Sequence, residues 1–216
     1  LAMANAFVKA GMAREILLVN ADTYSKYINP KDRSTRVLFG DGAAATIVKE
    51  SNERKGIIDI DLRSAGSGFN KFWMPAGGLR LPKSENTSLE VEDDKGNIRT
   101  QNDIEMDGMG VWSFINSVTP KQIDMLLKRN NLKKTNIDQF IFHQASLMTL
   151  ESIMRLMKLS KEQVFINVYN VGNTVSASIP ITLKDAIDQD KINTGSTLIL
   201  SGFGVGLSYG TILMDY

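Results

Sequence analysis

The chain has 216 residues, of which 43% are apolar and 23% are charged, and its formal net charge is +1. This length can bury a substantial core, and the near-zero charge gives no reason to expect a nucleic-acid partner. Cysteine is absent and histidine occurs once, which excludes a disulfide framework and a cysteine nucleophile within these residues and argues against a metal site. No apolar run is long enough for a membrane span and no signal-peptide pattern opens the sequence, so we expect a cytoplasmic protein with no membrane partner.

The first quarter is expected to fold as a helix followed by strands. In chain order the pattern predicts a helix, a buried strand, a polar loop and two further strands, at residues 2–10, 15–20, 21–36, 37–39 and 44–48. Gly11 is placed to end the helix. Because no capping residue or initiator methionine precedes Ala2, we expect the helix to begin in a preceding segment, so that the chain is part of a longer protein.

The middle of the chain is dominated by a long polar stretch. Residues 57–62 alternate at period two and predict a half-exposed strand, whereas residues 64–107 read as a loop. A loop of this length within a compact domain is usually functional or mobile. Two helices are expected next, one over residues 109–117 and a second that begins at Thr119-Pro120.

The last third is expected to alternate strands and helices. The pattern predicts strand, helix, strand, helix and two closing strands, at residues 139–142, 147–158, 164–168, near 179–180, 197–200 and 207–214. The order helix, strand, Gly-x-Gly turn, strand occurs both in residues 2–48 and in residues 180–214. A duplicated α/β unit with mixed sheets is the simplest architecture that explains this repeat.

Two polar residues near predicted strand ends are candidates for a site. His143 is the only imidazole and follows a strand, where α/β folds form ligand crevices, although a hydrogen-bonded structural histidine is an equal alternative. Asn173 lies 30 residues later in the loop before a helix, and on its own it reads more readily as a helix cap. Since both residues follow consecutive predicted strands of one sheet, we expect them to share an edge.

Two glycine motifs also have alternative readings. Gly40-x-Gly42-x-x-Ala45 matches a dinucleotide-binding fingerprint, but β-forming residues follow it in place of a helix, so we reject nucleotide binding. The sequence SGFGVG at residues 201–206 would let backbone amides approach a ligand oxygen, and it equally suits a tight turn between strands.

Four motifs occur together in one order: FGDGAAATIV, FHQAS, YNVGNTVSASIP and LILSGFGVGLSYGTILMDY. In this order, and with the spacing from His143 to Asn173, they resemble the β-ketoacyl-ACP synthase III family. The resemblance implies an α/β thiolase fold of two similar halves, with mixed sheets and buried helices in α-β-α-β-α layers. Residues 1–55 would then be the end of the first half, without its nucleophilic cysteine, and residues 56–216 the complete second half.

The resemblance also implies a chemistry. In this family a cysteine takes an acyl group from acyl-CoA, and the carbanion formed when malonyl-ACP loses CO₂ condenses with that group. The cysteine is expected about seven residues, or about two helical turns, before Leu1. No cofactor is implied beyond the coenzyme A thioester and the phosphopantetheine of the carrier protein. The expected pathway is fatty acid biosynthesis, and the residues present here are expected to be inactive on their own.

The resemblance assigns roles to the candidate residues. His143 and Asn173 are expected to hold the malonyl thioester oxygen, where negative charge develops as CO₂ leaves. Phe203 is expected to flank the site. Backbone amides near Gly204 and Val205 are expected to help form the oxyanion hole for the acyl group.

Further residues are matched to substrate binding and assembly. Arg33, Gly108 and Ser146 are expected to serve coenzyme A or carrier-protein binding, and the strand at residues 15–20 to pair across a homodimer axis. The chain departs from the family at Ser146 and Met148, where Asn and Arg are frequent. These departures leave open a ketosynthase of a polyketide or surface-saccharide pathway. Two further alternatives are a non-decarboxylating enzyme like hydroxymethylglutaryl-CoA synthase and a degenerate, non-catalytic partner subunit.

Overall fold

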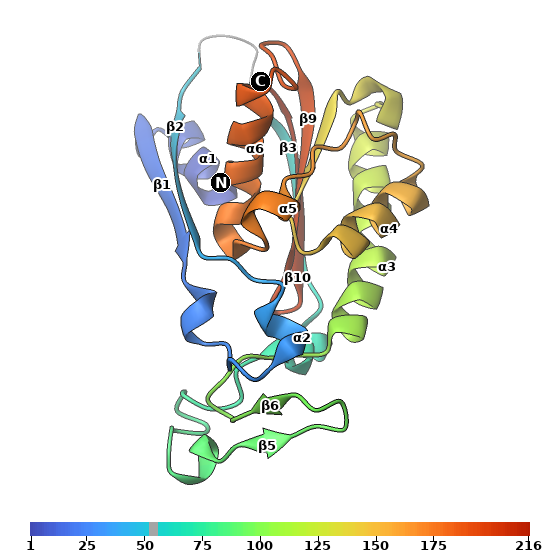
Figure 1. Cartoon of the computed structure of the whole chain (residues 1–216). Helices are drawn as coiled ribbons and strands as arrows, with labels where there is room; N and C mark the ends of the chain where they lie inside the picture. Colours follow the sequence, from blue (N-terminus) through green and yellow to red (C-terminus); the bar gives the residue numbers. More distant parts are fainter. Residues whose placement is uncertain (52–55) are drawn as a thin grey trace.

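The computed structural model describes residues 1–51 and 56–216, whose strands form two main sheets (Figure 1). The smaller sheet pairs β1, Glu15–Asp22, with β2, Gly42–Lys49, in antiparallel register. The larger sheet has the strand order β3-β10-β9-β8; its β8–β9 pair is parallel and its other pairs are antiparallel. These four strands are Gly56–Ser64, Ser208–Asp215, Thr197–Gly204 and Gln139–Phe142. The predicted α/β class with mixed sheets is confirmed.

Helices fill the space between the sheets and cover the far face of the larger one (Figure 1). α1, Ala2–Lys9, and α6, Ser178–Asp188, lie between the sheets, since both contact β2 and α6 also contacts β8 and β9. α3, Gly108–Arg129, and α4, Leu147–Met157, pack together on the other face of the larger sheet. The described residues therefore form four successive layers, β-α-β-α. In this part of the chain, no helix combines the length and the apolar character needed to cross a membrane.

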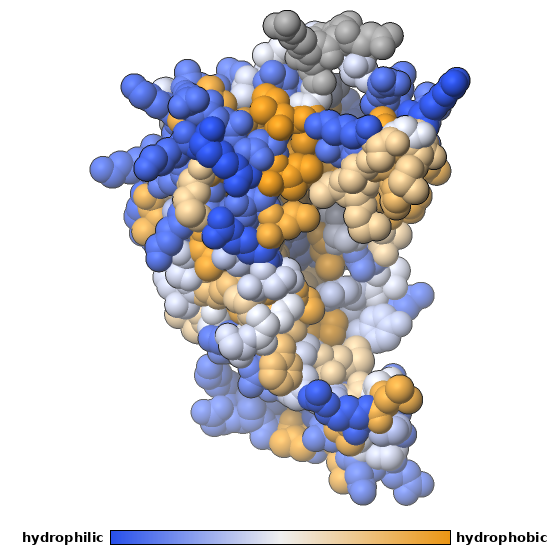
Figure 2. All heavy atoms as spheres, turned by 180° about the vertical axis from the view of Figure 1, so that it is seen from behind, coloured by the Kyte–Doolittle hydropathy of each residue, from blue (hydrophilic) through white to orange (hydrophobic). Residues whose placement is uncertain are grey.

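Each face of the larger sheet has its own apolar core. Along β8, Phe140 and Phe142 join the core next to α3 and α4, whereas Ile141 joins the core next to α6. All four residues of β8 are buried, as expected for a parallel strand covered on both faces. On the rear of the molecule, further apolar side chains gather near the middle, around a shaded hollow (Figure 2). β8 thus ends at a fixed place between two packed layers, and His143 is the next residue.

The predicted repeat is visible in the structure. α1, β1 and β2 follow one another in the same order as α6, β9 and β10, and each strand pair is antiparallel. The first unit carries an insertion that contains a 3-10 turn, Tyr24–Lys26, and α2, Arg33–Arg36. The expected boundary between the two halves touches residues 52–55, which lie outside the described residues, and this division stays a prediction.

The predicted break between two helices is wrong. α3 runs without interruption from Gly108 to Arg129 and contains Pro120. A proline inside a helix removes one backbone hydrogen bond and crowds the preceding turn. Here a buried stripe that includes Ile115, Ile123 and Leu127 continues on both sides of the proline. The burial of this stripe outweighs the cost of the proline.

Two predicted strands are also wrong. Residues 37–39 form a turn in which Phe39 makes one isolated bridge, to Asn173. Residues 164–168 contribute one isolated bridge, made by Val164.

The second error has its cause in hydrogen bonds to a side chain of another segment. The side chain of Gln144 accepts the backbone N–H groups of Asn167 and Val168 at 3.1 and 3.2 Å. These groups are then not free to extend a strand ladder. A short helix, α5, Val168–Val171, begins at this point.

Residues 64–107, predicted as a loop, form a projecting layer of short elements (Figure 1). The layer has 3-10 turns and two short antiparallel strand pairs. These elements are Gly66–Lys71 and Asn86–Ser88, then β4, Phe72–Trp73, with β7, Glu105–Met106, and β5, Val91–Glu92, with β6, Ile98–Arg99. Arg99 forms an ion pair at 3.0 Å with Asp32, which is fully buried. This pair fastens the β5–β6 hairpin to the N-terminus of α2.

Candidate active site

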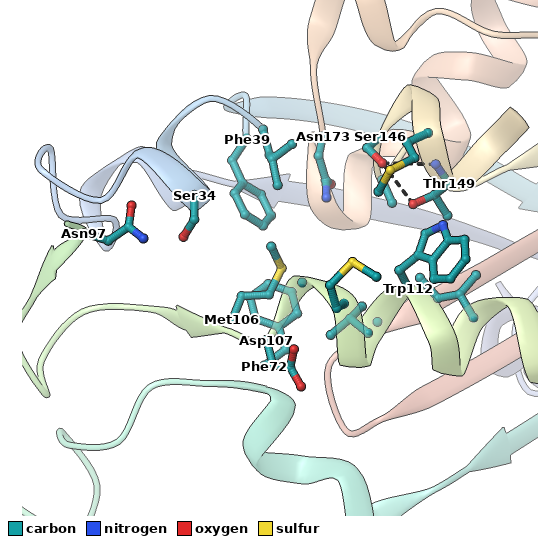
Figure 3. Close-up of a pocket in the computed structure, with 18 of the residues that line it drawn as sticks. Ser34, Phe39, Phe72, Asn97, Met106, Asp107, Trp112, Ser146, Thr149 and Asn173 are labelled. Atoms are coloured by element: carbon teal, nitrogen blue, oxygen red, sulfur yellow. Dashed lines mark hydrogen bonds between the residues drawn. The ribbon is translucent and has the colours of Figure 1, made fainter. Parts of the chain in front are cut away.

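A cavity of about 530 Å³ lies where the ends of β8 and β9, the starts of α3 and α4, and the β5–β6 hairpin meet. His143 and Asn173 both line it, so the structure brings the two predicted site residues together. In Figure 3, Asn173 points into this space, and the labelled residues Asn97 and Trp112 lie toward its opposite ends. The shared sheet edge that was predicted for the two residues is wrong, because Asn173 follows α5 and not a strand.

His143 is positioned by the end of β8. Its backbone N–H donates to the carbonyl of Ser201 on β9 at 2.9 Å, and its own carbonyl accepts the N–H of Ala145 at 2.9 Å. The edge of its ring meets Phe203, with ring centroids 5.6 Å apart and planes at 81°. Burial lowers the pKa of His143 to about 4. The imidazole is therefore neutral at pH 7 and offers one N–H donor.

Asn173 is positioned by its backbone and by its own side-chain oxygen. Its N–H donates to the carbonyl of Leu38 at 2.9 Å, and its carbonyl accepts the N–H of Gly40 at 3.0 Å. The side-chain oxygen Oδ1 accepts the N–H of Val175 at 3.0 Å, within the 3-10 turn Val175–Ala177. Among the described residues, no hydrogen bond involves Nδ2. The amide group therefore directs two N–H donors away from its own loop.

Glycines account for the close packing of this loop on the Gly40-Asp41-Gly42 turn. A Cβ atom on Gly40 would lie 2.2 Å from the carbonyl oxygen of Val171, and one on Gly42 would lie 2.9 Å from the Thr174 side chain. Gly172 has φ 66° and ψ −161°, a conformation that is almost restricted to glycine. Gly42 opens strand β2, which confirms the structural ground for rejecting a nucleotide-binding fingerprint. The motif instead supports Asn173.

Val175 holds an unusual conformation next to this amide. Its φ is 53°, which is rare for a β-branched residue and costs on the order of 1–3 kcal/mol. The N–H of this residue donates to Oδ1 of Asn173 at 3.0 Å. Backbone strain is thus located where the amide is oriented.

The residues predicted to flank the site or to form the oxyanion hole lie at the end of β9 or directly after it. Phe203 and Gly204 line the main cavity, whereas Val205 lines an adjoining cavity of about 300 Å³, to which His143 and Asn173 also contribute. The structure therefore brings Phe203, Gly204 and Val205 around His143, and it places Val205 on the side away from the β5–β6 hairpin.

The residues predicted for coenzyme A or carrier binding are in different positions. Gly108 and Ser146 line the main cavity. The Ser146 hydroxyl caps α4, because it accepts the N–H of Thr149 at 3.2 Å and shares a hydrogen bond of 2.9 Å with the Thr149 hydroxyl. Arg33 is exposed and does not line the cavity, although its neighbour Ser34 does.

Comparisons with known proteins identify the family of the chain. A family model described as 3-Oxoacyl-[acyl-carrier-protein (ACP)] synthase III C terminal matches residues 127–216, and the model of 3-Oxoacyl-[acyl-carrier-protein (ACP)] synthase III matches residues 1–66. A β-ketoacyl-[acyl-carrier-protein] synthase III from Caldanaerobacter subterraneus subsp. tengcongensis is 38% identical over 216 residues, which are 100% of this chain and 62% of the relative. A second protein of this name, from Campylobacter curvus, is 34% identical over the same shares of both chains. This chain belongs to the β-ketoacyl-ACP synthase III family.

Solved structures of the family share the fold. A crystal structure of a 3-oxoacyl-(acyl-carrier-protein) synthase III matches with a TM-score of 0.97 and 36% identity, over 100% of this chain and 64% of that one. The Thermus thermophilus β-ketoacyl-ACP synthase III matches with a TM-score of 0.85 and 31% identity, over 100% and 63%. A priming β-ketosynthase of the R1128 polyketide pathway is 25% identical, with a TM-score of 0.81, over 99% and 60%. The predicted thiolase-like fold is confirmed, and the chain spans less than two thirds of the length of these relatives.

Sequence reasoning missed several residues that line the cavity of this family member. Trp112 follows Gly108 by one helical turn, and Thr149 follows Ser146 by three residues, so helical spacing alone would have found both. The hairpin residues Asp93, Asn97 and Arg99, which also line it, gave no such signal, because the pairing of β5 with β6 cannot be read from a polar stretch.

The hairpin side of the cavity is held by charged hydrogen bonds. Hydrogen bonds from Asn97, together with the charge of Arg99, lower the pKa of Asp93 to about 2. Arg99 also forms an ion pair with Asp93 at 2.5 Å. It therefore links two residues within the hairpin in addition to linking the hairpin to α2. In the described residues, no group of three or more His, Cys, Asp or Glu side chains is arranged to hold a metal ion.

Proposed function

We propose that this chain is the C-terminal part of a β-ketoacyl-ACP synthase III that condenses an acyl group from acyl-CoA with malonyl-ACP and releases CO₂. The observation that carries the proposal is the pairing of His143 and Asn173 on one cavity. A neutral imidazole and an amide whose NH₂ group makes no hydrogen bond to the described residues both supply N–H donors. Neither group adds a negative charge that would repel an anionic oxygen. Such a pair suits the oxygen of a thioester that becomes an enolate.

The reaction explains why two donors are needed. When the malonyl carboxylate leaves as CO₂, its electron pair passes to the α-carbon, and negative charge accumulates on the thioester oxygen. Fixed donors stabilise this charge more than they stabilise the neutral thioester, which lowers the barrier. The carbanion then forms a carbon–carbon bond to the acyl carbonyl, and the enzyme thiolate leaves. Phe203, Gly204 and Val205 are the proposed surroundings of the acyl carbonyl.

We further propose that the nucleophilic cysteine precedes Leu1 on the same helix as α1. The adjoining cavity next to His143 shares Ser176, Ile179 and Gly202 with a third cavity, of about 310 Å³, that reaches Leu1. About seven additional helical residues extend about 10 Å, which suits this path. The N-terminus of such a helix would also favour the thiolate.

The exposed face of the smaller sheet supports a longer protein and an assembly. Leu17, Val19 and Ile47 are 65%, 59% and 67% exposed, and they alternate onto one face of β1 and β2. An apolar sheet face of this kind is normally covered, which fits the missing outer helical layer of the family fold. The outer edge of β1 has no strand partner among the described residues, which supports the proposed homodimer. The proposed location is the cytoplasm, and the proposed substrates need no metal or other cofactor.

The alternatives are less well supported. The curated relatives are named β-ketoacyl-[acyl-carrier-protein] synthase III and are 34% and 38% identical, against 25% for the polyketide priming enzyme. A degenerate partner subunit has no chemical need for a donor pair on a cavity.

The test uses the whole protein with substitutions at Asn173. Asn173→Asp keeps an oxygen that can accept the Val175 N–H but has no N–H to donate, and Asn173→Ala removes both functions. We expect malonyl decarboxylation to fall by about 10²–10³-fold in both variants, while radiolabelled acyl-CoA still acylates the cysteine. Asn170→Ala, an exposed change in α5 just before this loop, is the control. Normal condensation by Asn173→Ala would refute the role assigned to this residue.

A further inference from the structure

A buried hydrogen-bond network begins at the residue after His143. Gln144 is completely buried. Its backbone N–H donates to the hydroxyl of Ser178 on the first turn of α6 at 2.7 Å. The peptide that follows His143 is therefore tied directly to a helix of the central layer.

The side chain of Gln144 ties the same point to the segment that leads to Asn173. Its oxygen accepts the N–H groups of Asn167 and Val168 at 3.1 and 3.2 Å, and its nitrogen donates to the carbonyls of Phe142 and Phe165 at 3.0 and 3.4 Å. The amide thus uses both acceptor positions and both hydrogens. α5 starts at Val168, and the chain then passes through Gly172 to Asn173.

Asn167 fixes the other side of this segment. Its Nδ2 donates to Asp185 at 2.7 Å, and its Oδ1 accepts the hydroxyl of Thr182 at 2.9 Å, both on α6. Asn167 and Thr182 are 3% and 0% exposed. Hydrogen bonds inside a protein are costly to leave unmade, so the start of α5 has little freedom to shift relative to β8 and α6.

We propose that Gln144 is a positioning residue that sets the separation between the His143 ring and the Asn173 amide. This inference rests on the proposed function. Both donors must reach one thioester oxygen, and a displacement of about 1 Å at such a site costs about 10²-fold in rate. Gln144 adjoins one donor through a peptide bond and sets the start of the short helix that leads to the other.

The chain offers a matched control at the opposite end of β8. Gln139 is 6% exposed, and its Nε2 donates to the carbonyl of Glu162 at 2.6 Å. It therefore ties the same strand to the same neighbouring segment, but away from the cavity. Its loss should cost less stability, because it removes one side-chain hydrogen bond where the loss of Gln144 removes four, and it should move neither donor.

The experiment compares Gln144→Met with Gln139→Met in the whole protein, at a temperature at which near-ultraviolet circular dichroism shows both to be folded. We expect Gln144→Met to lower kcat for malonyl-thioester decarboxylation by 10–100-fold, with KM and the rate of acyl transfer changed by less than threefold. Gln139→Met should change none of these. A folded Gln144→Met variant with the kcat of Gln139→Met would overturn the inference, as would equal losses in decarboxylation and acyl transfer.

Two further measurements keep the test decisive. If Gln144→Met does not fold, Gln144→Glu replaces it, because a glutamate keeps an acceptor oxygen and loses donor capacity. We expect this variant to show a smaller fall in kcat at unchanged KM, and a wild-type kcat would refute the positioning role.

If the wild-type protein does not decarboxylate malonyl thioesters, the proposed function fails. The ring resonances of His143 then decide the inference, which requires them to move in Gln144→Met and not in Gln139→Met.

Discussion

His143 and Asn173 face one cavity, but the two regions that hold them differ. His143 follows β8, a strand that is buried on both faces, and its N–H is bound by Ser201 of the neighbouring strand. Asn173 lies in a loop between α5 and a 3-10 turn, and Leu38 and Gly40, from a distant part of the sequence, hold its backbone. One donor is supported by a sheet and the other by the contact of two turns.

The two donors are therefore held in place by different numbers of contacts. The strand is held by a ladder of hydrogen bonds and by two cores, so the loss of one contact leaves it in place. The loop depends on a close approach that leaves no room for an added atom at Gly40 and on a conformation at Gly172 that other residues rarely adopt. Substitutions on the loop side should therefore affect structure and chemistry together.

Gly40→Ala should break the loop support and produce the largest effect. The added Cβ atom would lie 2.2 Å from the carbonyl oxygen of Val171, so either the end of α5 or the segment at Gly40 must move. We expect the free energy of unfolding to fall by about 2–4 kcal/mol and decarboxylation to fall toward the level of Asn173→Ala. Chemical denaturation and the decarboxylation assay check the two parts.

Gly66→Ala is the control for this prediction. A Cβ atom at Gly66 meets nothing within 4 Å, and the residue lies in a 3-10 turn of the projecting layer. We expect its stability to stay within about 1 kcal/mol of the wild type. Equal losses in the two alanine variants would contradict the claim that the close approach at Gly40 supports the site.

The same contrast explains what could be predicted from the sequence. β8 and His143 at its end were predictable, because a short buried apolar run marks the strand and its end marks the site. The position of Asn173 near His143 was predicted for a wrong reason, since no strand precedes it. Contacts between segments that are distant in the sequence, such as Gly40 with Val171 of α5, leave no periodic signal in the sequence.

The other errors have the same physical origin. Pro120 is a local signal for a helix start, but tertiary packing of the stripe on α3 overrides it. The strand predicted at residues 164–168 fails because the side chain of Gln144 takes the hydrogen bonds that a strand partner needs. In each case a contact from another element outweighs the local pattern.

The enclosure of His143 at the end of β8, the strand side of the site, can be tested through the titration of its imidazole. Burial lowers its pKa to about 4, below the value of about 6.5 expected for the unfolded chain. The contribution of this group to stability is therefore constant above about pH 6.5 and decreases as the pH falls from 6.5 to 4. We expect the free energy of unfolding to drop by up to about 3 kcal/mol over this range for this reason alone.

His143→Gln provides the matched comparison. The difference in unfolding free energy between wild type and variant should depend on pH between 4 and 6.5 and be flat above that range. The wild-type ring resonance, identified by its loss in the variant, should titrate near pH 4. A midpoint near 6.5 would mean that the ring is solvated and that the strand side does not enclose it.

Asp61→Asn should give the smallest effect and separate stability from chemistry. Hydrogen bonds, first from Arg63 and then from Gln122, lower the pKa of Asp61 to about 2, although burial opposes them. Because this value lies below the unfolded pKa of about 3.9, the stabilisation is complete above about pH 4 and is lost as the pH falls toward 2. Arg63 is 41% exposed, so we expect a contribution of only about 1 kcal/mol.

The consequence for the site follows from the network behind Asp61. Gln122 bonds both to Asp61 and to the hydroxyl of Thr211, which in turn contacts the hydroxyl of Ser201. Ser201 holds His143 through its backbone carbonyl, which the sheet fixes independently of that hydroxyl. Asp61→Asn should therefore flatten the loss of stability between pH 4 and 2 and leave decarboxylation at pH 7 within twofold of the wild type. A tenfold loss of rate would show that the strand side is as easily disturbed as the loop side.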